Sequence, residues 1–165
     1  MSQGSAGPSG QVRRYRVAFI CIKNSCRSQM AEAFARRYAE DIIEPFSTGP
    51  EPAATLDPNA VAVMKEVGVD ISSQRPKLLP VNVLASMDLV VHVGCGSERC
   101  LVVPGVLSEE WHLDDCAGAD LGKLRAIRVA VEREIRGLAE RLRSSGLAGV
   151  GPSPVTVKDF PLTSL

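Results

Sequence analysis

A short loop between an apolar run and a helical segment constrains this chain more than any other feature. The run from Val17 to Ile20 predicts a buried strand, and the residues from Gln29 to Arg36 predict a helix. Between them lies the stretch Cys21-Ile-Lys-Asn-Ser-Cys-Arg27-Ser28. A strand, a tight loop and a helix N-terminus direct backbone N–H groups at one point, where the helix dipole also favours an anion. We therefore expect an anion-binding loop at the end of the first strand.

Two side chains of this loop predict chemistry as well as binding. Cys21 stands at the start of the loop, where the same dipoles favour the thiolate, which is the nucleophilic form of cysteine. Arg27 stands at its end and offers a planar fork of donors that suits a tetrahedral oxyanion. The loop therefore predicts a site that binds a phosphate-like anion and attacks it with sulfur. The alternative, a structural cysteine and a surface arginine, is disfavoured by the strand–loop–helix context.

Composition limits the remaining choices. A chain of 165 residues, 45% hydrophobic and 23% charged, is expected to form one soluble domain. The formal net charge of zero argues against a nucleic-acid or membrane surface, and no apolar run is long enough to span a bilayer. The cysteines number five, and an odd count favours catalytic or redox chemistry over a disulfide framework. We expect a cytoplasmic monomer that binds neither nucleic acid nor membrane.

Strands and helices alternate along the chain, which favours a parallel sheet covered on both faces. The predicted strands are 15–20, 42–48 and 88–93, and the predicted helices are 28–40, 59–67, 81–86 and 119–142. The segment 102–115 is expected to be a loop. The domain is expected over 15–143, with a disordered leader over 1–14 and an extended or disordered tail over 144–165. The last helix has an apolar stripe of Leu121, Leu124, Val131, Ile135, Leu138 and Leu142.

Three blocks of sequence resemble the thioredoxin-coupled arsenate reductases, which share the fold of the low-molecular-weight protein tyrosine phosphatases. The most specific block is Cys21 followed by Asn24-Ser-Cys-Arg-Ser-Gln-Met-Ala-Glu-Ala33. The others run from Asp57 to Ser72 and from Asp88 to Gly96, and the resemblance spans roughly 16–142. It implies a three-layer α/β fold with a four-stranded parallel sheet, helices on both faces, and the anion loop at the carboxyl ends of the strands.

The resemblance also implies a reaction. Cys21 attacks arsenate, for which phosphate or sulfate would be anion mimics, and an aspartate protonates the departing oxygen. Asp115 stands at the family's position for this acid, with Asp114 as the alternative, and Cys116 follows where the family usually has proline. The implied substrate-binding residues are Lys23, Asn24, Ser25, Cys26, Arg27 and Ser28, of which Ser28 can also donate a hydrogen bond to the thiolate.

Reduction needs further thiols, and the resemblance implies a relay. Cys95 attacks the Cys21–arsenic adduct and releases arsenite, and Cys100 then takes over the disulfide as Cys95–Cys100. Thioredoxin resets the enzyme. No tightly bound cofactor is implied, but some relatives bind K⁺ or Na⁺ near the loop, and the matching positions are Asn24, Glu32, Ser47 and Asp70.

Two other functions stay open at this point. A tyrosine phosphatase would use Cys21, Arg27 and Asp115 without a second thiol. A redox- or metal-sensing module would use Cys95, Cys100 and Cys116, with His92 as a further ligand.

Cys26 is expected to be a packed structural thiol. Lys23 stands where the family usually has glycine, so it either carries backbone strain or adds positive charge to the anion site.

Overall fold

The computed structural model describes residues 13–95 and 100–150. Its strands form one parallel sheet in the order β2-β1-β3-β4. This confirms the expected four-stranded α/β fold. In chain order the elements are β1 (Tyr15–Ile20), α1 (Arg27–Tyr38), β2 (Ile43–Thr48), α2 (Pro58–Lys65), α3 (Val81–Ala85), β3 (Leu89–Val93), β4 (Ser108–Trp111), α4 (Leu121–Ser145) and a 3₁₀ turn (Gly146–Gly149).

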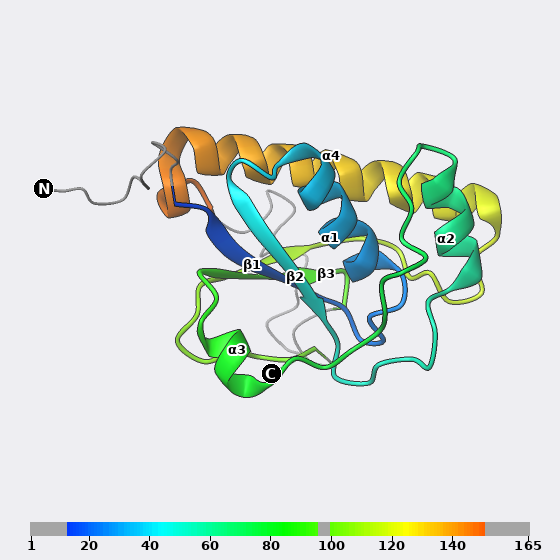
Figure 1. The fold of residues 1–165 in the computed structure, drawn as a ribbon, viewed down its shortest axis with the longest axis horizontal. Coiled ribbons are helices and arrows are strands. Elements are labelled where there is room, and N and C mark those ends of the chain that lie inside the picture. The colour runs from blue at the N-terminus through cyan, green and yellow to red at the C-terminus, as the bar shows by residue number, and fades with distance from the viewer. Residues whose placement is uncertain (1–12, 96–99, 151–165) are drawn as a thin grey trace, which may run out of the picture.

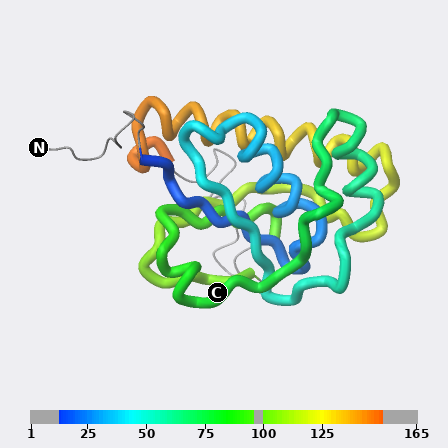
Figure 2. The backbone as a smooth tube through the Cα atoms, viewed as in Figure 1, coloured from blue at the N-terminus to red at the C-terminus, as the bar shows by residue number. Residues whose placement is uncertain are grey.

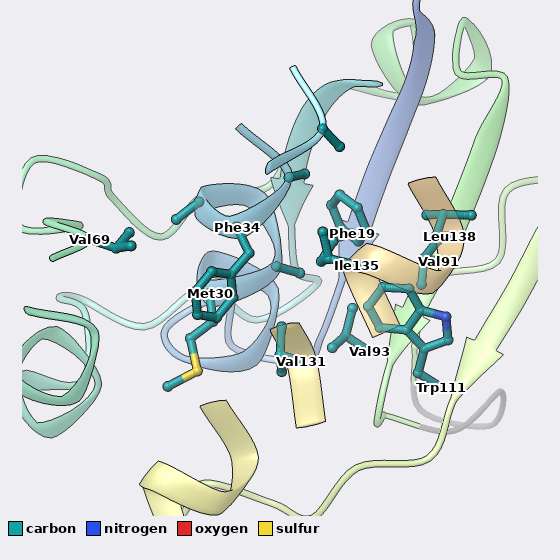
Figure 3. Packing of buried hydrophobic residues seen from close by; sticks show 14 of the residues in the cluster. Phe19, Met30, Phe34, Val69, Val91, Val93, Trp111, Val131, Ile135 and Leu138 are labelled. Carbon is teal, nitrogen blue, oxygen red and sulfur yellow. The ribbon is translucent and has the colours of Figure 1, made fainter. Parts of the chain in front are cut away.

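The sheet separates two apolar layers of unequal size. Helices α1 and α4 cover one face with α2 beside them, and α3 lies on the other side (Figure 1). Side chains alternate along β1, so Phe19 belongs to the larger cluster and Ile20 to the smaller one. In the larger cluster Phe19 lies against Trp111, with ring centroids 5.8 Å apart, and Ile135 of α4 closes over them (Figure 3). The sheet is therefore buried on both faces, as its apolar central strands require.

The helix starts explain where the site forms. Asp57 caps α2 by accepting a hydrogen bond from the Asn59 amide at 2.9 Å, and Asp120 caps α4 through the Lys123 amide at 2.8 Å. Helix α1 differs, because its N-cap, Cys26, makes no side-chain capping bond. The free N–H groups of this helix start are thus left for the anion loop.

Strand β4 lies in a segment that was expected to be a loop. Its sequence, Ser-Glu-Glu-Trp, has no apolar run, but Glu109 and Trp111 are buried while Ser108 is exposed. The alternation typical of an edge strand is present, but a glutamate occupies one of the buried positions. A hydrophobicity pattern misses such a strand because the buried carboxylate is paired with Arg141 of α4 at 2.8 Å.

The end of the domain also differs from the prediction. Helix α4 continues to Ser145, and Leu147 and Val150 pack against the core, so residues 144–150 are not an extended tail. Leu121, expected in the apolar stripe, is exposed at the start of the helix. The predicted leader over 1–12 and the rest of the tail, 151–165, lie outside the described residues. None of the helices in the described ranges is long and apolar enough to cross a membrane.

Candidate active site

The loop from Cys21 to Cys26 turns its amides inward. The carbonyl oxygens of Ile22, Lys23 and Ser25 each accept a hydrogen bond, at 3.0 Å, from an amide in the segment 51–57. Within the described residues, the amides from Lys23 to Ser28 donate to no protein acceptor. Because the carbonyls point outward to the neighbouring segment, the N–H groups line the inside of the loop. This is the geometry that holds a tetrahedral oxyanion at a helix N-terminus.

Two chain segments hold the loop in place. Gly49, directly after β2, lies so close that a Cβ there would be 2.5 Å from the Cys21 carbonyl oxygen and 2.6 Å from that of Ile22. A side chain at this position would therefore displace the loop. The segment between α2 and α3 also passes beside the loop (Figure 2), and its Lys77 carbonyl accepts a hydrogen bond from the Gly49 amide at 3.0 Å.

A chain of buried hydrogen bonds ends at the Cys21 thiol. Cys21 is a free, buried cysteine whose Sγ lies 2.9 Å from Ser28 Oγ. Asn24 Nδ2 donates to Ser28 Oγ at 2.7 Å, and Asn24 Oδ1 accepts at 2.9 Å from both the Lys77 amide and Gln29 Nε2. These two donors fix the orientation of the Asn24 amide, so Ser28 accepts from Asn24 and keeps its own hydrogen available for sulfur. A hydrogen bond donated in this way stabilises the thiolate.

The backbone angles of the loop show whether Lys23 carries the strain considered for it. Among the described residues other than glycine, Asn24 has a positive φ, of 50°, and Lys23 does not. Asparagine tolerates this left-handed conformation better than most residues. The expected strain at Lys23 is therefore not found, and its exposed side chain is free to extend from the loop.

Arg27 connects the loop to the ends of two other elements. Its guanidinium is buried, and Nη1 donates to the Gly94 carbonyl at 2.9 Å and to the Asp114 carbonyl at 3.4 Å. Nη2 lies 3.7 Å from Asp115 Oδ1. Gly94 has a φ of +83°, and a Cβ there would collide with the guanidinium. Arg27 thus holds the end of β3 and the loop before α4 at the anion site.

Asp115, rather than Asp114, turns its carboxylate toward this site. The carboxylate accepts a hydrogen bond from the Ala117 amide at 3.0 Å. This bond, with the positive charge of Arg27 as a smaller cause, holds the pKa of Asp115 below its ordinary value. Asp114 contributes its backbone carbonyl to Arg27. The geometry favours Asp115 as the predicted acid.

The two cysteines of the predicted relay lie next to the anion loop. Cys95 and Cys100 are joined by a disulfide. Their sulfurs lie 3.5 and 3.9 Å from the carbonyl oxygen of Ile20, the residue before Cys21. A pocket of about 370 Å³ opens beside Cys95 and is lined by Gly94 and by residues 110–114. The segment 96–99 lies outside the described residues.

A second disulfide joins Cys26 to Cys116, which the sequence did not predict. Cys26 was expected to be a packed structural thiol, and Cys116 was noted because it stands where the family usually has proline. The two residues are 90 positions apart in sequence, so no local pattern connects them. The five cysteines thus form two pairs and one free thiol instead of one thiol cluster. In the described ranges no group of three or more His, Cys, Asp or Glu side chains can hold a metal ion, so the metal-sensing alternative gains no support.

Two of the four predicted cation ligands lie beside a lysine that the sequence analysis missed. Ser47 Oγ donates a short hydrogen bond to Glu32 Oε1, and both side chains are buried. Lys77 Nζ lies 3.1 Å from Ser47 Oγ and 3.7 Å from Glu32 Oε1. Asp70, a further predicted ligand, is exposed and accepts a hydrogen bond from the Ser72 amide. The chain itself therefore supplies a positive charge beside two of the predicted ligands.

Comparison with known proteins decides the family. The family model described as low molecular weight phosphotyrosine protein phosphatase matches residues 16–147. The chain belongs to this family.

Several relatives at 34–45% identity are arsenate reductases, which agrees with the resemblance seen in the sequence. One, from Shouchella clausii, is 44% identical over 106 residues, covering 63% of this chain and 76% of the relative. A solved arsenate reductase in the phosphate-binding state is 33% identical, with a TM-score of 0.66, over 77% of this chain and 98% of that one. A thioredoxin-dependent arsenate reductase from Corynebacterium glutamicum is 34% identical, with a TM-score of 0.67, over 80% of this chain and 63% of that one.

Proposed function

We propose that this protein reduces arsenate to arsenite and that thioredoxin restores it after each turnover. One observation carries the proposal. The anion loop contains a free, buried Cys21, and the Cys95–Cys100 disulfide lies against the residue just before it. A tyrosine phosphatase needs the loop and its nucleophile but has no use for a neighbouring dithiol.

The first step uses the loop, Arg27 and Asp115. The inward amides and Arg27 hold the oxygens of arsenate while the Cys21 thiolate attacks arsenic. One oxygen must leave as water, and a proton from Asp115 makes this possible. Asp115 is ionised in the free enzyme at neutral pH, because its pKa is lowered. A doubly negative anion bound beside it raises its proton affinity, so substrate binding itself favours the protonated acid.

The second step transfers two electrons from sulfur to arsenic. The Cys95 thiolate attacks Cys21 Sγ, a new S–S bond forms, and the S–As bond breaks with its electron pair on arsenic, which leaves as arsenite. Cys100 then attacks Cys95 and releases the Cys21 thiolate, leaving Cys95–Cys100 for reduction by the thioredoxin dithiol. The structure has the covalent state expected at the end of this sequence, with Cys21 free and Cys95–Cys100 joined.

The accessibility of the thiols to a reductant supports the same order of events. The pocket of about 370 Å³ beside Cys95 gives a reductant an approach to the relay disulfide. Cys95 is half-buried, whereas Cys21 is buried in its loop. We propose that the protein works as a monomer in the cytoplasm, where thioredoxin keeps dithiols reduced.

The test is arsenite release in the presence of thioredoxin, thioredoxin reductase and NADPH. We expect turnover by the wild type, less than one arsenite per chain from Cys95→Ser, and loss of multiple turnovers from Cys100→Ser. The matched control is Ser73→Ala, at an exposed position. The proposal fails if the wild type releases no arsenite while wild type and Cys95→Ser hydrolyse p-nitrophenyl phosphate equally, because the protein would then be a phosphatase.

A further inference from the structure

Few side chains of the loop between β4 and α4 are buried. From residue 112 to residue 123, Cys116 is the one buried side chain among these described residues. It is followed by Ala117, Gly118 with a φ of +68°, and the half-buried Ala119, none of which offers a large side chain for packing. This loop carries Asp115. Besides the contacts with Arg27, the main attachment of this loop near the acid is therefore Cys116.

Cys116 is attached to the other half of the active site. Its disulfide partner, Cys26, is the N-cap of α1 and directly precedes Arg27. The Cα atoms of the two cysteines are 6.6 Å apart, within the range of about 4.4–6.8 Å that a disulfide spans. The bond thus joins the residue before the anion-binding arginine to the residue after the acid.

The two disulfides lie on opposite faces of the sheet. Cys26 and Cys116 belong to the apolar cluster that contains α1 and α4, whereas Cys100 belongs to the cluster on the α3 side, with Cys95 packed against it. Thiol–disulfide exchange needs one sulfur to approach another in line. Since the two pairs pack in different apolar clusters, we infer that the Cys26–Cys116 pair is separate from the relay.

We propose that the Cys26–Cys116 disulfide is a second redox site that positions Asp115 for proton transfer at the anion loop. The proposal rests on the arsenate reductase function and assigns Cys116 the role of a positioning residue. With the bond made, the Asp115 carboxylate stays within 3.7 Å of Arg27 Nη2. With the bond reduced, the loop of small residues loses its covalent attachment and Asp115 is held less closely at the site.

The redox chemistry balances with a hydroperoxide as oxidant. Each thiol gives up its hydrogen, the S–S bond forms, and the two electrons and two protons break the O–O bond, giving two waters from hydrogen peroxide. Thioredoxin can reverse the reaction in principle, but both sulfurs are buried whereas Cys95 borders a pocket. The relay disulfide is therefore reduced first, and the positioning disulfide survives catalytic turnover.

The first experiment maps the bonds in the full chain. The protein is reduced, freed of reductant, oxidised with two equivalents of hydrogen peroxide, one for each expected disulfide, and alkylated. Its disulfides are then identified by mass spectrometry before and after limiting thioredoxin. We expect Cys26–Cys116 and Cys95–Cys100 with Cys21 unpaired, and then loss of Cys95–Cys100 alone. A Cys21–Cys26 bond, or an alkylated Cys116 in the oxidised protein, would overturn the proposal. Neither result depends on arsenate reduction.

The second experiment tests positioning. Cys116→Val keeps an apolar side chain of similar size but removes the disulfide. Cys116→Ser removes both the disulfide and the apolar side chain. We expect each to lower kcat for arsenate about tenfold, with KM changed less than about twofold, because a displaced acid affects proton transfer more than anion binding. In an Asp115→Asn background the same substitutions should cause no further loss, since Cys116 acts through that carboxylate.

A readout besides activity separates this proposal from the function on which it rests. Hydrogen exchange of the peptide covering 112–119 should be faster in Cys116→Val than in the oxidised wild type, with exchange in β1 and β3 unchanged. Equal exchange, or equal kcat in wild type and both variants, would refute the positioning role. If the wild type reduces no arsenate but the bond forms and protects 112–119, the proposed function fails while the second disulfide stands.

Discussion

Replacing Ser28 with alanine tests the hydrogen-bond network at the nucleophile. Ser28 Oγ lies 2.9 Å from Cys21 Sγ, and it accepts a hydrogen bond from Asn24 Nδ2 at 2.7 Å. We predict that the hydroxyl donates its own hydrogen to sulfur. A hydrogen bond to a charged group contributes about 1.5–3 kcal/mol, and each 1.36 kcal/mol is a factor of about ten, so losing it in Ser28→Ala should slow the reactions of Cys21 about 10- to 100-fold. Both side chains are fully buried, so water cannot replace the lost donor easily.

The assay is the rate of iodoacetamide alkylation of Cys21 at pH 7, followed by peptide-resolved mass spectrometry. In the oxidised protein the other four cysteines are in disulfides, so Cys21 alone reacts. We expect Ser28→Ala to react about 10- to 100-fold more slowly than the wild type, and Ser73→Ala, the same change at an exposed position, to react at the wild-type rate. An unchanged rate in a folded Ser28→Ala protein would show that Ser28 accepts rather than donates, and the reasoning on Asn24 would be wrong.

Three further predictions concern other parts of the site and the fold. Gly94→Ala places a Cβ against the Arg27 guanidinium and should raise KM for arsenate about tenfold, because a charge-assisted hydrogen bond is displaced; an unchanged KM in steady-state kinetics would contradict this. Lys77→Met removes the ammonium beside Glu32 and Ser47, so the activity of the variant should become dependent on K⁺. When activity is compared in potassium chloride and tetramethylammonium chloride, the variant should be more active in the potassium salt, whereas the wild type should respond equally to both. Arg125 and Arg128 lower the pKa of Glu66 to about 2 from 4.5, so the stability advantage of the wild type over Glu66→Gln should be full above pH 4.5 and be lost as pH falls toward 2. Urea midpoints measured across that pH range check the sign, and a difference that grows in acid would refute it.

Local patterns in the sequence predicted the elements that carry the nucleophile. The strand 15–20 was predicted with the bounds that β1 has, and the loop after it turns its amides inward as expected. These features depend on neighbours in sequence, namely an apolar run, a loop and a helix start. The resemblance added Cys95, Cys100 and Asp115, which the structure places at the same edge of the sheet.

What the sequence did not predict depends on partners distant along the chain. Strand β4 was missed because its buried Glu109 is compensated by Arg141, 32 residues later. The lysine at the expected cation site was missed because Lys77 reaches Ser47 from the segment after α2. No period or spacing in one sequence connects such pairs, since each depends on how the elements pack and not on the order of neighbouring residues.

The arrangement of the thiols follows from the sheet itself. Side chains at the carboxyl end of β1 leave the strand toward both faces, and Cys21 stands at the point where the two apolar layers meet the anion loop. One cysteine pair lies in each layer, so Cys21 is the thiol next to both the anion loop and the relay. In the roles we propose, the fold thus places the disulfide that turns over in the relay and the disulfide that holds the acid in different apolar layers of one domain.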